Sequence, residues 1–375
     1  MREVFVASDN IFSPLGRDSA VNFEQLQIGR SGIRQHHKSK TSAHSFYASL
    51  FQDEVFDPGS TYTKFEQALI YSIEDALKRT RLDARDDKTI FILSSTKGNI
   101  SLLESGELDN GVREKITLHH SASLIANRFG FIHQPIVVSH ACISGLLAII
   151  TGMRMLQRGL YKHAIIAGAD IITRFVLSGF HSFQAISPEP CKPFDANRKG
   201  ITLGEGASTV ILSVDANMGK SDVQIRSGSV TNDANHISGP SRTGDELHHA
   251  IRQAMEGAEI GASDIDFISA HGTATLYNDD MEARAINLSK LEHVPVNSLK
   301  GCYGHTLGAA GLIESVVSIH SLRQNLLIPT VGFSEIGTVE PIQVIDKMQS
   351  REMSTCLKTA SGFGGCNAAM VIVKE

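Results

Sequence analysis

The stretch IVVSHACISGLLAII, residues 136–150, decides the fold because it joins a short apolar segment to a longer one through a cysteine. Residues 136–139 predict a strand, and the apolar run that starts at Ile143 and continues to Gln157 predicts a helix. Cys142 then lies at a helix N-terminus, beside unpaired backbone N–H groups that we expect to favour the thiolate. Cys142 is therefore a candidate nucleophile, although an unreactive buried cysteine fits the same position.

Alternating strands and helices on both sides of this stretch predict an α/β fold. In the first part of the chain we expect strands at 4–7, 89–94, 136–139 and 163–168 and helices at 63–80, 122–129 and 143–157. In the second part we expect strands at 223–230, 265–269, 295–298 and 368–374 and helices at 245–255, 281–291 and 308–322. The two series follow the same order, so we expect two similar halves, residues 1–215 and 216–375, joined in one compact body.

The composition argues against several classes of protein. A chain of 375 residues can bury a large core, and its five cysteines, an odd number without regular spacing, argue against a disulfide framework. A net charge of −5 gives no support to nucleic-acid binding. The sequence has neither the pattern of a signal peptide nor an apolar run long enough to cross a bilayer. These features predict a cytoplasmic enzyme that binds neither nucleic acid nor a membrane.

Two histidines lie in short segments that are rich in glycine and hydroxyl residues. His271 follows a predicted strand in the segment AHGTAT, and His305 lies in the segment KGCYGHTLGAAG. Glycines allow a backbone or a substrate to approach closely, so both histidines are candidate catalytic residues. Lys300 begins the second segment, and Glu314 lies on the following predicted helix, from which it could turn back toward Lys300. A surface lysine and a capping glutamate fit the same two positions.

A third candidate feature is the glycine-rich turn SGFGGCN, residues 361–367, before the last predicted strand. Such a turn can direct backbone N–H groups at an oxyanion, as acyl transfer requires, although many hairpins also need two glycines. Phe363 is bulky and lies between two glycines, so it is a candidate gate that swings aside for a substrate. An ordinary core phenylalanine beside a tight turn fits the position as well.

In their order along the chain, these segments resemble the β-ketoacyl-acyl carrier protein synthases of the thiolase superfamily, in particular the elongating type with a Cys-His-His triad. The resemblance covers most of the chain and rests on Ser13–Gly16, Gly29–Ile33, Ala141–Cys142, Pro193–Asp195, Gly204–Gly206, Asp233–His236, His271–Thr275, Asn278–Asp279, Lys300–Gly311 and Gly362–Gly365. It implies a thiolase-like fold, with two βαβαβαββ-type halves in a five-layered α-β-α-β-α arrangement. It also implies that Cys142 and the histidine loops meet where the halves join.

The resemblance further implies a ping-pong condensation. An acyl group passes from acyl carrier protein to Cys142 as a thioester. Malonyl-acyl carrier protein then loses carbon dioxide and attacks that thioester, giving a β-ketoacyl product two carbons longer. The family pattern assigns His271 and His305 to the enolate that decarboxylation creates, because two imidazole donors in a dry site can stabilise its charge. It gives Lys300, paired with Glu314, a supporting electrostatic role.

The remaining site residues and the partners also follow from the resemblance. The backbone N–H groups of Cys142 and Phe363 form the oxyanion hole for acyl transfer, and Thr273 and Thr275 lie where the family contacts the pantetheine arm. No cofactor and no metal is expected to be bound, because the substrates are carried on the phosphopantetheine of acyl carrier protein. The expected partners are acyl carrier protein and a second chain, in a homodimer or in a heterodimer with a ketosynthase-like chain.

Several features depart from the family pattern. Residues 8–10, Ser-Asp-Asn, stand where the family has a glycine-rich turn after the first strand, and residues 94–98, Ser-Ser-Thr-Lys-Gly, replace a second glycine-rich segment. Cys366 replaces a hydroxyl residue, and fewer residues than usual separate Cys142 from His271. The acyl chain length is therefore open. Fatty-acid, polyene and polyketide synthesis all stay possible, and the irregularities slightly favour a specialised polyene or polyketide pathway.

Four alternatives compete with an elongating synthase. A degradative thiolase would use a second cysteine as base and would lack the Lys300 segment, and Cys366 follows the glycines at the wrong place for that role. An initiating synthase uses Cys-His-Asn, whereas the third position here is His305. A non-catalytic chain-length partner subunit keeps the fold and lacks the nucleophile, which Cys142 supplies here. A Cys-His hydrolase would have no use for the Lys300 segment.

Overall fold

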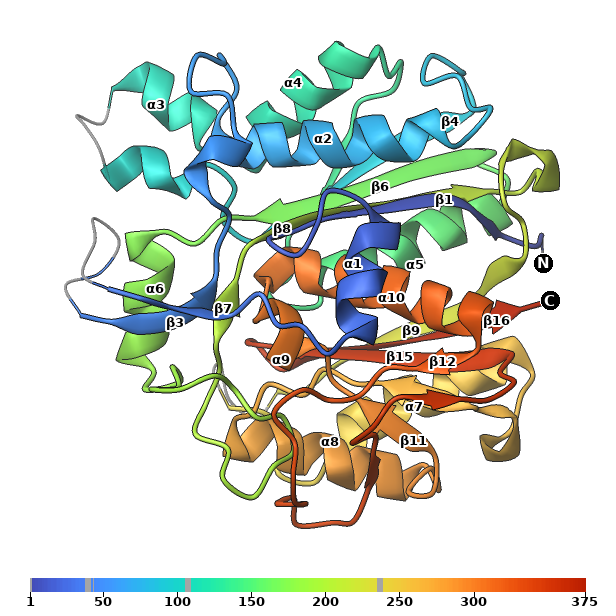
Figure 1. Ribbon diagram of the computed structural model, residues 1–375. Helices are drawn as coiled ribbons and strands as arrows, with labels where there is room; N and C mark the ends of the chain where they lie inside the picture. The colour runs from blue at the N-terminus through green and yellow to red at the C-terminus, as the bar shows by residue number, and fades with distance from the viewer. Residues whose placement is uncertain (1, 38–41, 43, 105–108, 235–238) are drawn as a thin grey trace.

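One sheet of eleven strands runs through the described part of the chain (Figure 1). The computed structural model describes residues 2–37, 42, 44–104, 109–234 and 239–375. From its outer edge inward, the N-terminal half of the sheet contains β5 (Ile136–Val138), β4 (Thr89–Ser94), β6 (His163–Asp170), β8 (Gly206–Ser213) and β1 (Phe5–Phe12). The C-terminal half contains β13 (Gln343–Val344), β11 (Pro295–Asn297), β10 (Phe267–Ser269), β15 (Thr355–Gly362), β16 (Cys366–Lys374) and β9 (Val223–Asn232).

The two halves of the sheet repeat one topology. In the N-terminal half β5, β4 and β6 are parallel, and β8 and β1 continue the sheet in antiparallel pairs. In the C-terminal half β11, β10 and β15 are parallel, and β16 and β9 continue the sheet in the same way. The halves are joined by the pairing of Phe5 with Gln224, between β1 and β9. The expected similarity of the two halves is therefore visible in their strand order, while the division at residue 215 stays a prediction.

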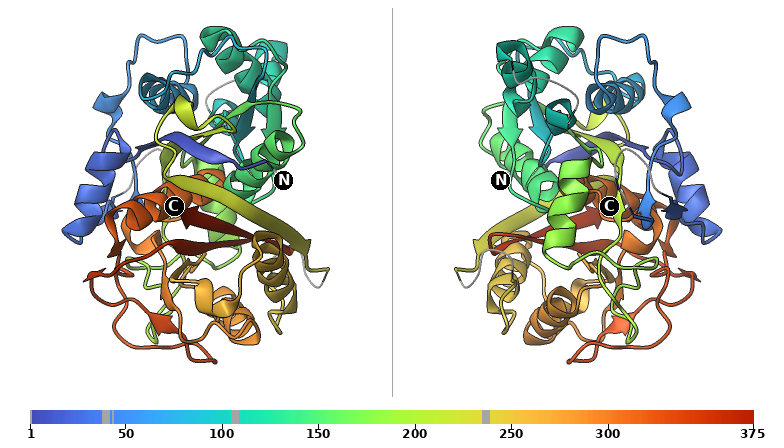
Figure 2. Two further views of the ribbon diagram at one scale, coloured as in Figure 1. Left: turned by 90° about the vertical axis from the view of Figure 1, so that its right-hand side faces the viewer. Right: turned by 90° about the vertical axis from the view of Figure 1, so that its left-hand side faces the viewer.

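Helices separate and cover the two halves of the sheet, which gives five layers (Figures 1 and 2). The outer layers contain α2 (Lys64–Lys78) and α4 (Leu118–Phe129) on the N-terminal half and α7 (Asp245–Ala258) and α8 (Leu276–Leu288) on the C-terminal half. The middle layer contains α5 (Ser144–Gln157) and α10 (Ala310–Gln324), whose apolar side chains belong to one buried core. This is the α-β-α-β-α order that the resemblance implied. None of the helices in the described residues is long and apolar enough to cross a membrane.

The two central helices approach each other closely at their N-terminal ends, where glycines leave room for it. A Cβ atom added at Gly145 of α5 would lie 2.8 Å from the carbonyl oxygen of Gly308, and one added at Gly311 of α10 would lie 2.5 Å from the backbone nitrogen of Leu146. Real Cβ atoms do not approach other atoms so closely, so side chains at these positions would push the helices apart. This contact brings the start of α5, next to Cys142, against the start of α10.

Shorter elements surround this frame. They are the helices α1 (Ser19–Gln27), α3 (Asn110–Lys115), α6 (Arg174–Ser182) and α9 (Lys300–Tyr303), the strands β2 (Arg34–His36), β3 (Phe46–Ser49), β7 (Leu203–Gly204), β12 (Leu326–Leu327) and β14 (Gln349–Ser350), and the 3-10 turns η1 (Asp53–Val55), η2 (Ile100–Glu104), η3 (Ala216–Met218), η4 (Ala262–Asp264) and η5 (Leu307–Ala309). Strands β2, β3 and β7 form a small separate sheet, and β12 pairs with β14.

The first strand is longer than the sequence indicates. The segment Ser8–Asn10 belongs to β1 and forms no turn, because its buried polar side chains all find partners. The Ser8 hydroxyl donates to the Ala76 carbonyl oxygen at 2.8 Å, Asp9 accepts from His320 at 2.8 Å, and the Asn10 amide donates to Asp75 at 2.6 Å. Buried polar groups are tolerated in a strand when they are paired in this way.

Candidate active site

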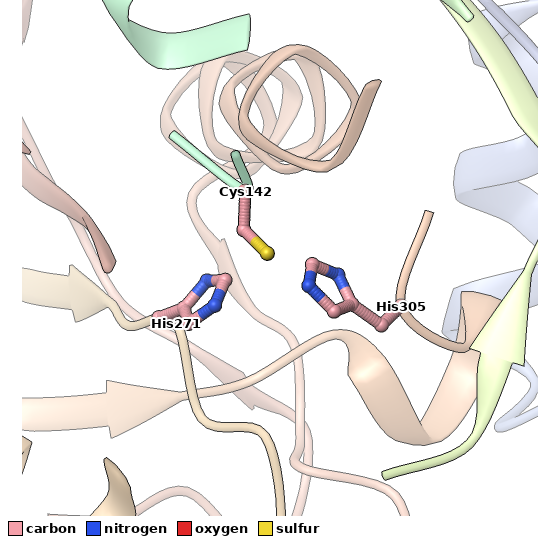
Figure 3. Close-up of side chains that lie close together, drawn as sticks. All are labelled: Cys142, His271 and His305. Carbon is pink, nitrogen blue, oxygen red and sulfur yellow. The ribbon is translucent and has the colours of Figure 1, made fainter. Parts of the chain in front are cut away.

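Cys142, His271 and His305 meet at one point between the two halves of the molecule (Figure 3). The Cys142 sulfur and a ring nitrogen of each histidine all lie within 4.8 Å of one another, and all three side chains are buried. The two imidazole rings are 5.1 Å apart and nearly perpendicular, at 84°. Cys142 follows β5, His271 follows β10 and His305 lies between α9 and η5. The expected meeting of the nucleophile with the two histidine loops is confirmed.

Cys142 sits on a tight turn that the chain holds in an unusual backbone conformation. The turn precedes α5, which begins at Ser144, and Ala141 has a φ of 45°, a left-handed value that costs free energy in a residue with a Cβ atom. The Ser144 hydroxyl donates to the Ala141 carbonyl oxygen at 2.6 Å and accepts from the His140 amide at 2.8 Å. The turn is therefore fixed from within, with the thiol held clear of the helix.

The thiol is protonated in the free protein, so the expectation of a stabilised thiolate is wrong. Burial raises the pKa of Cys142 to about 12, and nearby Cys366 and Asp170 act in the same direction, whereas Lys300 and the backbone N–H of Phe363 oppose the rise. The loss of hydration around the buried sulfur outweighs the favourable effects of Lys300 and the Phe363 backbone N–H. Cys142 can therefore act as a nucleophile only if it loses this proton when a substrate is in place.

Both histidines are neutral at neutral pH. Burial, followed by the positive charge of Lys300, lowers the pKa of His271 and of His305 well below the usual value. The Lys300 ammonium lies 3.4 Å from Nδ1 of His271, so Nδ1 accepts and the ring proton is on Nε2. Neither ring nitrogen of His305 has a hydrogen-bond partner among the described residues. A buried polar group without a partner is costly, which suits a site that awaits a ligand.

The predicted pair of Lys300 and Glu314 is present and fully buried, and a second lysine joins it. Lys300 donates to one carboxylate oxygen of Glu314, and Nζ of Lys358 lies 2.8 Å from the other. Lys358, which is buried in β15 beside the glycine-rich turn, was not predicted as a site residue from the sequence. The sequence signal that could have identified it is a lysine in the middle of the segment TCLKTASG, because a charged side chain is buried in an inner strand only where it is paired.

Two buried carboxylates hold the loop that carries His271, and neither of them was assigned a role from the sequence. Glu282 on α8 accepts from the His271 amide at 2.7 Å and from the Gly272 amide at 2.6 Å. Asp279, three residues earlier, accepts from the Thr273 amide at 2.9 Å. Burial raises the pKa of Asp279 to about 7. Their spacing of three residues in the first turns of a helix is the sequence signal, since it places both carboxylates on one face.

A third buried carboxylate joins the N-terminal half to the His305 loop. Asp170, the last residue of β6, accepts from the Ser95 hydroxyl at 2.8 Å and from the Gly308 amide at 2.7 Å. Ser95 belongs to the segment after β4 in which the family's glycines are missing. The serine hydroxyl therefore has a structural use here, because it helps to fix the carboxylate that holds η5.

A cavity of about 470 Å³ leads from the surface to the three side chains, and it is lined mainly by apolar groups. Thr273 and Thr275 line it, as expected for residues that meet a substrate arm, and their hydroxyls lie 2.8 Å apart. Phe363 lies at the same cavity and is 37% exposed, so the alternative that it is a core phenylalanine is wrong. Its ring packs on Phe180 at 5.8 Å and on Phe183 at 5.3 Å.

Other motifs that carry the resemblance have structural partners. Glu205 accepts from the Phe51 amide at 2.9 Å and from the Ile172 amide at 3.0 Å, and so ties β3 to the end of β6. Asp195 accepts from the backbone and the hydroxyl of Ser334 at 2.7 and 2.8 Å. In the motif at 233–236, residues 235 and 236 lie outside the described residues.

In the described part of the chain, Cys142, His271 and His305 also form the group of side chains compact enough to hold a metal ion. Thiolate and imidazole are ligands that zinc accepts. Lys300 and Lys358, however, place positive charge behind His271, and this charge repels a dication. The arrangement suits a substrate that carries or develops negative charge, and the absence of a bound metal stays a prediction.

Comparison with known proteins identifies the family of the chain. The model of the beta-ketoacyl synthase N-terminal domain matches residues 1–216, and that of the C-terminal domain matches residues 223–334. The chain is 27% identical to a putative mitochondrial 3-oxoacyl-[acyl-carrier-protein] synthase of Schizosaccharomyces pombe, with 100% of this chain and 99% of the relative covered. It is 28% identical to 3-oxoacyl-[acyl-carrier-protein] synthase 2 of Vibrio cholerae, with 99% and 98% covered.

Solved structures show the same fold. The ishigamide ketosynthase/chain length factor matches with a TM-score of 0.91 at 24% identity, covering 100% of this chain and 99% of that one. The ketosynthase ApeO, in complex with its chain length factor ApeC from Xenorhabdus doucetiae, matches with a TM-score of 0.86 at 23% identity, covering 100% and 98%. The expected thiolase-like fold is confirmed. Since both family models match in chain order, and the first contains Cys142 while the second contains His271 and His305, the chain belongs to the beta-ketoacyl synthase family.

Proposed function

We propose that this protein is an acyltransferase that catalyses decarboxylative Claisen condensation. An acyl group held on Cys142 is joined to malonyl-acyl carrier protein, and the product is a β-ketoacyl-acyl carrier protein two carbons longer. The observation that carries the proposal is the protonated thiol of Cys142 between two buried, neutral imidazoles. A nucleophile with two adjacent hydrogen-bond donors is what thioester exchange and enolate formation require.

In the first half-reaction the Cys142 sulfur attacks the thioester carbonyl of the acyl donor. The imidazole of His305, whose ring nitrogens have no hydrogen-bond partner among the described residues, can accept the thiol proton as the new carbon–sulfur bond forms. The backbone N–H of Phe363, which already points at the Cys142 sulfur, and that of Cys142 itself stabilise the negative oxygen. The bond to the carrier thiol then breaks, and that thiol leaves with the proton.

In the second half-reaction the malonyl thioester loses carbon dioxide. The electron pair of the broken carbon–carbon bond moves into an enolate whose oxygen accepts hydrogen bonds from His271 and His305. Lys300 fixes His271 with its donor on Nε2, directed away from the ammonium. The enolate carbon attacks the Cys142 thioester, the carbon–sulfur bond breaks, and the released Cys142 thiolate takes up a proton from solvent. Burial strengthens each of these interactions, because the site has a low effective dielectric constant.

Acyl carrier protein is the proposed substrate carrier. The cavity lets an extended arm reach Cys142 from the surface, and the hydroxyls of Thr273 and Thr275 can bond its amide groups. One solved neighbour, at a TM-score of 0.88 and 20% identity, is a type II polyketide synthase acyl-carrier protein in complex with its ketosynthase. No bound cofactor is needed in this scheme, since the carrier brings the reactive thioester.

A second ketosynthase-like chain is the proposed structural partner. Strand β5 forms one edge of the large sheet, and Ile136 and Val137 on it are only partly buried. An apolar edge strand is a surface that another chain can cover. Two structural neighbours are named as complexes of a ketosynthase with a chain length factor, which supports a heterodimer, and a homodimer would use the same edge.

A condensation assay tests the proposed function. The protein, with its partner chain if one co-purifies, is incubated with acyl- and malonyl-acyl carrier protein, and the carrier is analysed by mass spectrometry. We expect a β-ketoacyl product two carbons longer. The alternative, a non-catalytic partner subunit, predicts no product and no acyl group on the protein. A thiolase-type enzyme would instead make its product from two acyl-coenzyme A molecules without loss of carbon dioxide.

Phe363 is expected to control the order of the two half-reactions. In Phe363→Ala the protein should stay folded, because the ring is 37% exposed and its loss costs less than the roughly 3–5 kcal/mol of a buried phenylalanine. The variant should decarboxylate malonyl-acyl carrier protein without a loaded acyl group, because the ring that blocks the cavity has been removed. Phe175→Ala, an exposed phenylalanine of α6, is the control. Unchanged ordering in a folded Phe363→Ala protein would contradict the gate.

A further inference from the structure

Lys358 is a buried lysine that has no role in the mechanism proposed above. It lies in β15, directly opposite Ser269 of the parallel neighbour β10, and is 0% exposed. Its ammonium donates to the carbonyl oxygens of Ser269 at 3.0 Å and of Thr359 at 2.6 Å. Strand β10 ends at Ser269, two residues before His271. Lys358 therefore holds the end of the strand from which the His271 loop departs.

The same ammonium also competes for the carboxylate that pairs with Lys300. One oxygen of Glu314 accepts from Lys300, and the other lies 2.8 Å from Nζ of Lys358. Two buried ammonium groups thus share one carboxylate at ion-pair distance. Glu282, which attracts both from farther away, offsets them less, so an excess of positive charge is left. That excess lies behind His271, whose Nδ1 is 3.4 Å from Lys300. A buried excess charge is costly unless something of opposite charge offsets it.

We propose that Lys358 is a positioning residue for the decarboxylation step. It pairs with one of the two carboxylate oxygens of Glu314, so that Glu314 neutralises Lys300 only in part and a positive field is left at His271 for the substrate anion. The inference rests on the proposed function, in which a malonyl carboxylate enters the site and an enolate replaces it. Both species are anions. A field prepared before they arrive stabilises them without rearrangement of the protein.

The field also keeps His271 in the form that the mechanism needs. Positive charge nearby disfavours the imidazolium, so the neutral ring keeps its Nε2 proton available as a donor. The titratable and charged groups that face this loop are Lys300 of α9, Lys358 of β15, Glu314 of α10, Glu282 and Asp279 of α8, His305 and Cys142. Removal of the Lys358 charge leaves Glu314 free to neutralise Lys300, so the pKa of His271 should rise and the imidazolium should persist to higher pH.

Two variants separate charge from support of the backbone. Lys358→Met removes the charge and keeps a long apolar chain, and Lys358→Gln removes the charge but keeps a donor for the Ser269 carbonyl. We expect both to lower the rate of malonyl decarboxylation about tenfold, less than the roughly 10²-fold or more for a direct oxyanion donor. Loading of Cys142 should change less than about twofold, because it does not create the enolate. The acid limb of the decarboxylation pH profile should move to higher pH.

The matched control is Lys374→Met, in which a lysine of the neighbouring strand β16 is removed. Lys374 donates to the Leu322 carbonyl oxygen at 2.9 Å and to Asn325 at 2.6 Å, outside the catalytic cavity. Lys374→Met should alter neither the ratio of the decarboxylation rate to the acyl-loading rate nor the pH profile of decarboxylation. If Lys358→Gln restores decarboxylation while Lys358→Met does not, the lysine only supports the backbone and the field is refuted. An unmoved acid limb in both variants refutes it too.

A second readout does not depend on the reaction. The titration of His271 is followed by NMR in protein with labelled imidazole carbons, with the signal assigned by its loss in His271→Asn. We expect His271 to titrate at higher pH in both Lys358 variants than in the unaltered protein, and Lys374→Met to match the latter. Failure of the unaltered protein to decarboxylate malonyl-acyl carrier protein would overturn the proposed function alone. An unchanged His271 titration would overturn the role of Lys358.

Discussion

Acyl loading is expected to disappear completely in Cys142→Ala. Incubation of the unaltered protein with acyl-acyl carrier protein should add one acyl mass, and peptide mapping should place it on Cys142. The sulfur of Cys142 opens to the cavity between two neutral imidazoles, of which His305 can take its proton, and no other group in the described chain combines these features. Thiol-to-thioester exchange needs all of them, since the free thiol has a pKa of about 12 and does not ionise unaided.

The neighbouring thiol Cys366 supplies the control for this result. It is buried, lies 3.4 Å from the Phe363 carbonyl oxygen and is part of the glycine-rich turn. Cys366→Ala should therefore load an acyl group as the unaltered protein does. An acyl label that persists in Cys142→Ala, or that maps to Cys302 or Cys366, would contradict the assignment of Cys142 as the nucleophile and would favour the thiolase-type alternative.

The second large effect is expected in His305→Ala, which should lower malonyl decarboxylation by roughly 10²-fold or more, as loss of an oxyanion donor does. His305 is buried and neither of its ring nitrogens has a partner among the described residues, so its donor is available to the enolate oxygen. His271→Ala should act similarly. Acyl loading should fall less, because the backbone N–H groups of Cys142 and Phe363 that stabilise its oxyanion stay in place.

The measurement is release of carbon dioxide from malonyl-acyl carrier protein, set beside the rate of Cys142 acylation in the same preparation. His248→Ala is a suitable control, because His248 lies on α7 and contacts Ser289, away from the cavity. A His305→Ala protein that decarboxylates normally but cannot be loaded would show that His305 serves acyl loading and not decarboxylation.

Much of the fold could be predicted because its signals are local. The runs that form β4, α5 and β6 are apolar and bounded by turns, so the predicted and observed bounds differ by two residues at most. Strands β8 and β15 were missed because hydroxyl residues and Lys358 interrupt their apolar runs. The inner position of these strands, and the paired partners that make it possible, depend on residues far away in the sequence.

The site was predictable as a set of residues but not as an electrostatic system. Cys142, His271 and His305 stand out by their junctions and glycines, and Lys300 by its relation to Glu314. The state of the thiol did not follow, because the helix N-terminus is visible in the sequence whereas the burial that raises the pKa of Cys142 depends on the whole packing. Lys358 and Glu282 were missed for the same reason, since each acts on a loop that belongs to another segment.

The contact between the glycines of α5 and α10 sets a limit on how this enzyme can be re-engineered. Gly145 and Gly311 already bring the two helix backbones into contact behind Cys142. These positions have no side chains to shorten, so room for a longer acyl chain cannot be made there. Room for new substrates has to be created at the cavity mouth, where Phe180 and Phe183 can be made smaller without disturbing the helix pair. Libraries for altered chain length should therefore vary Phe180 of α6 and Phe183 directly after it, and should leave the contact between α5 and α10 unchanged.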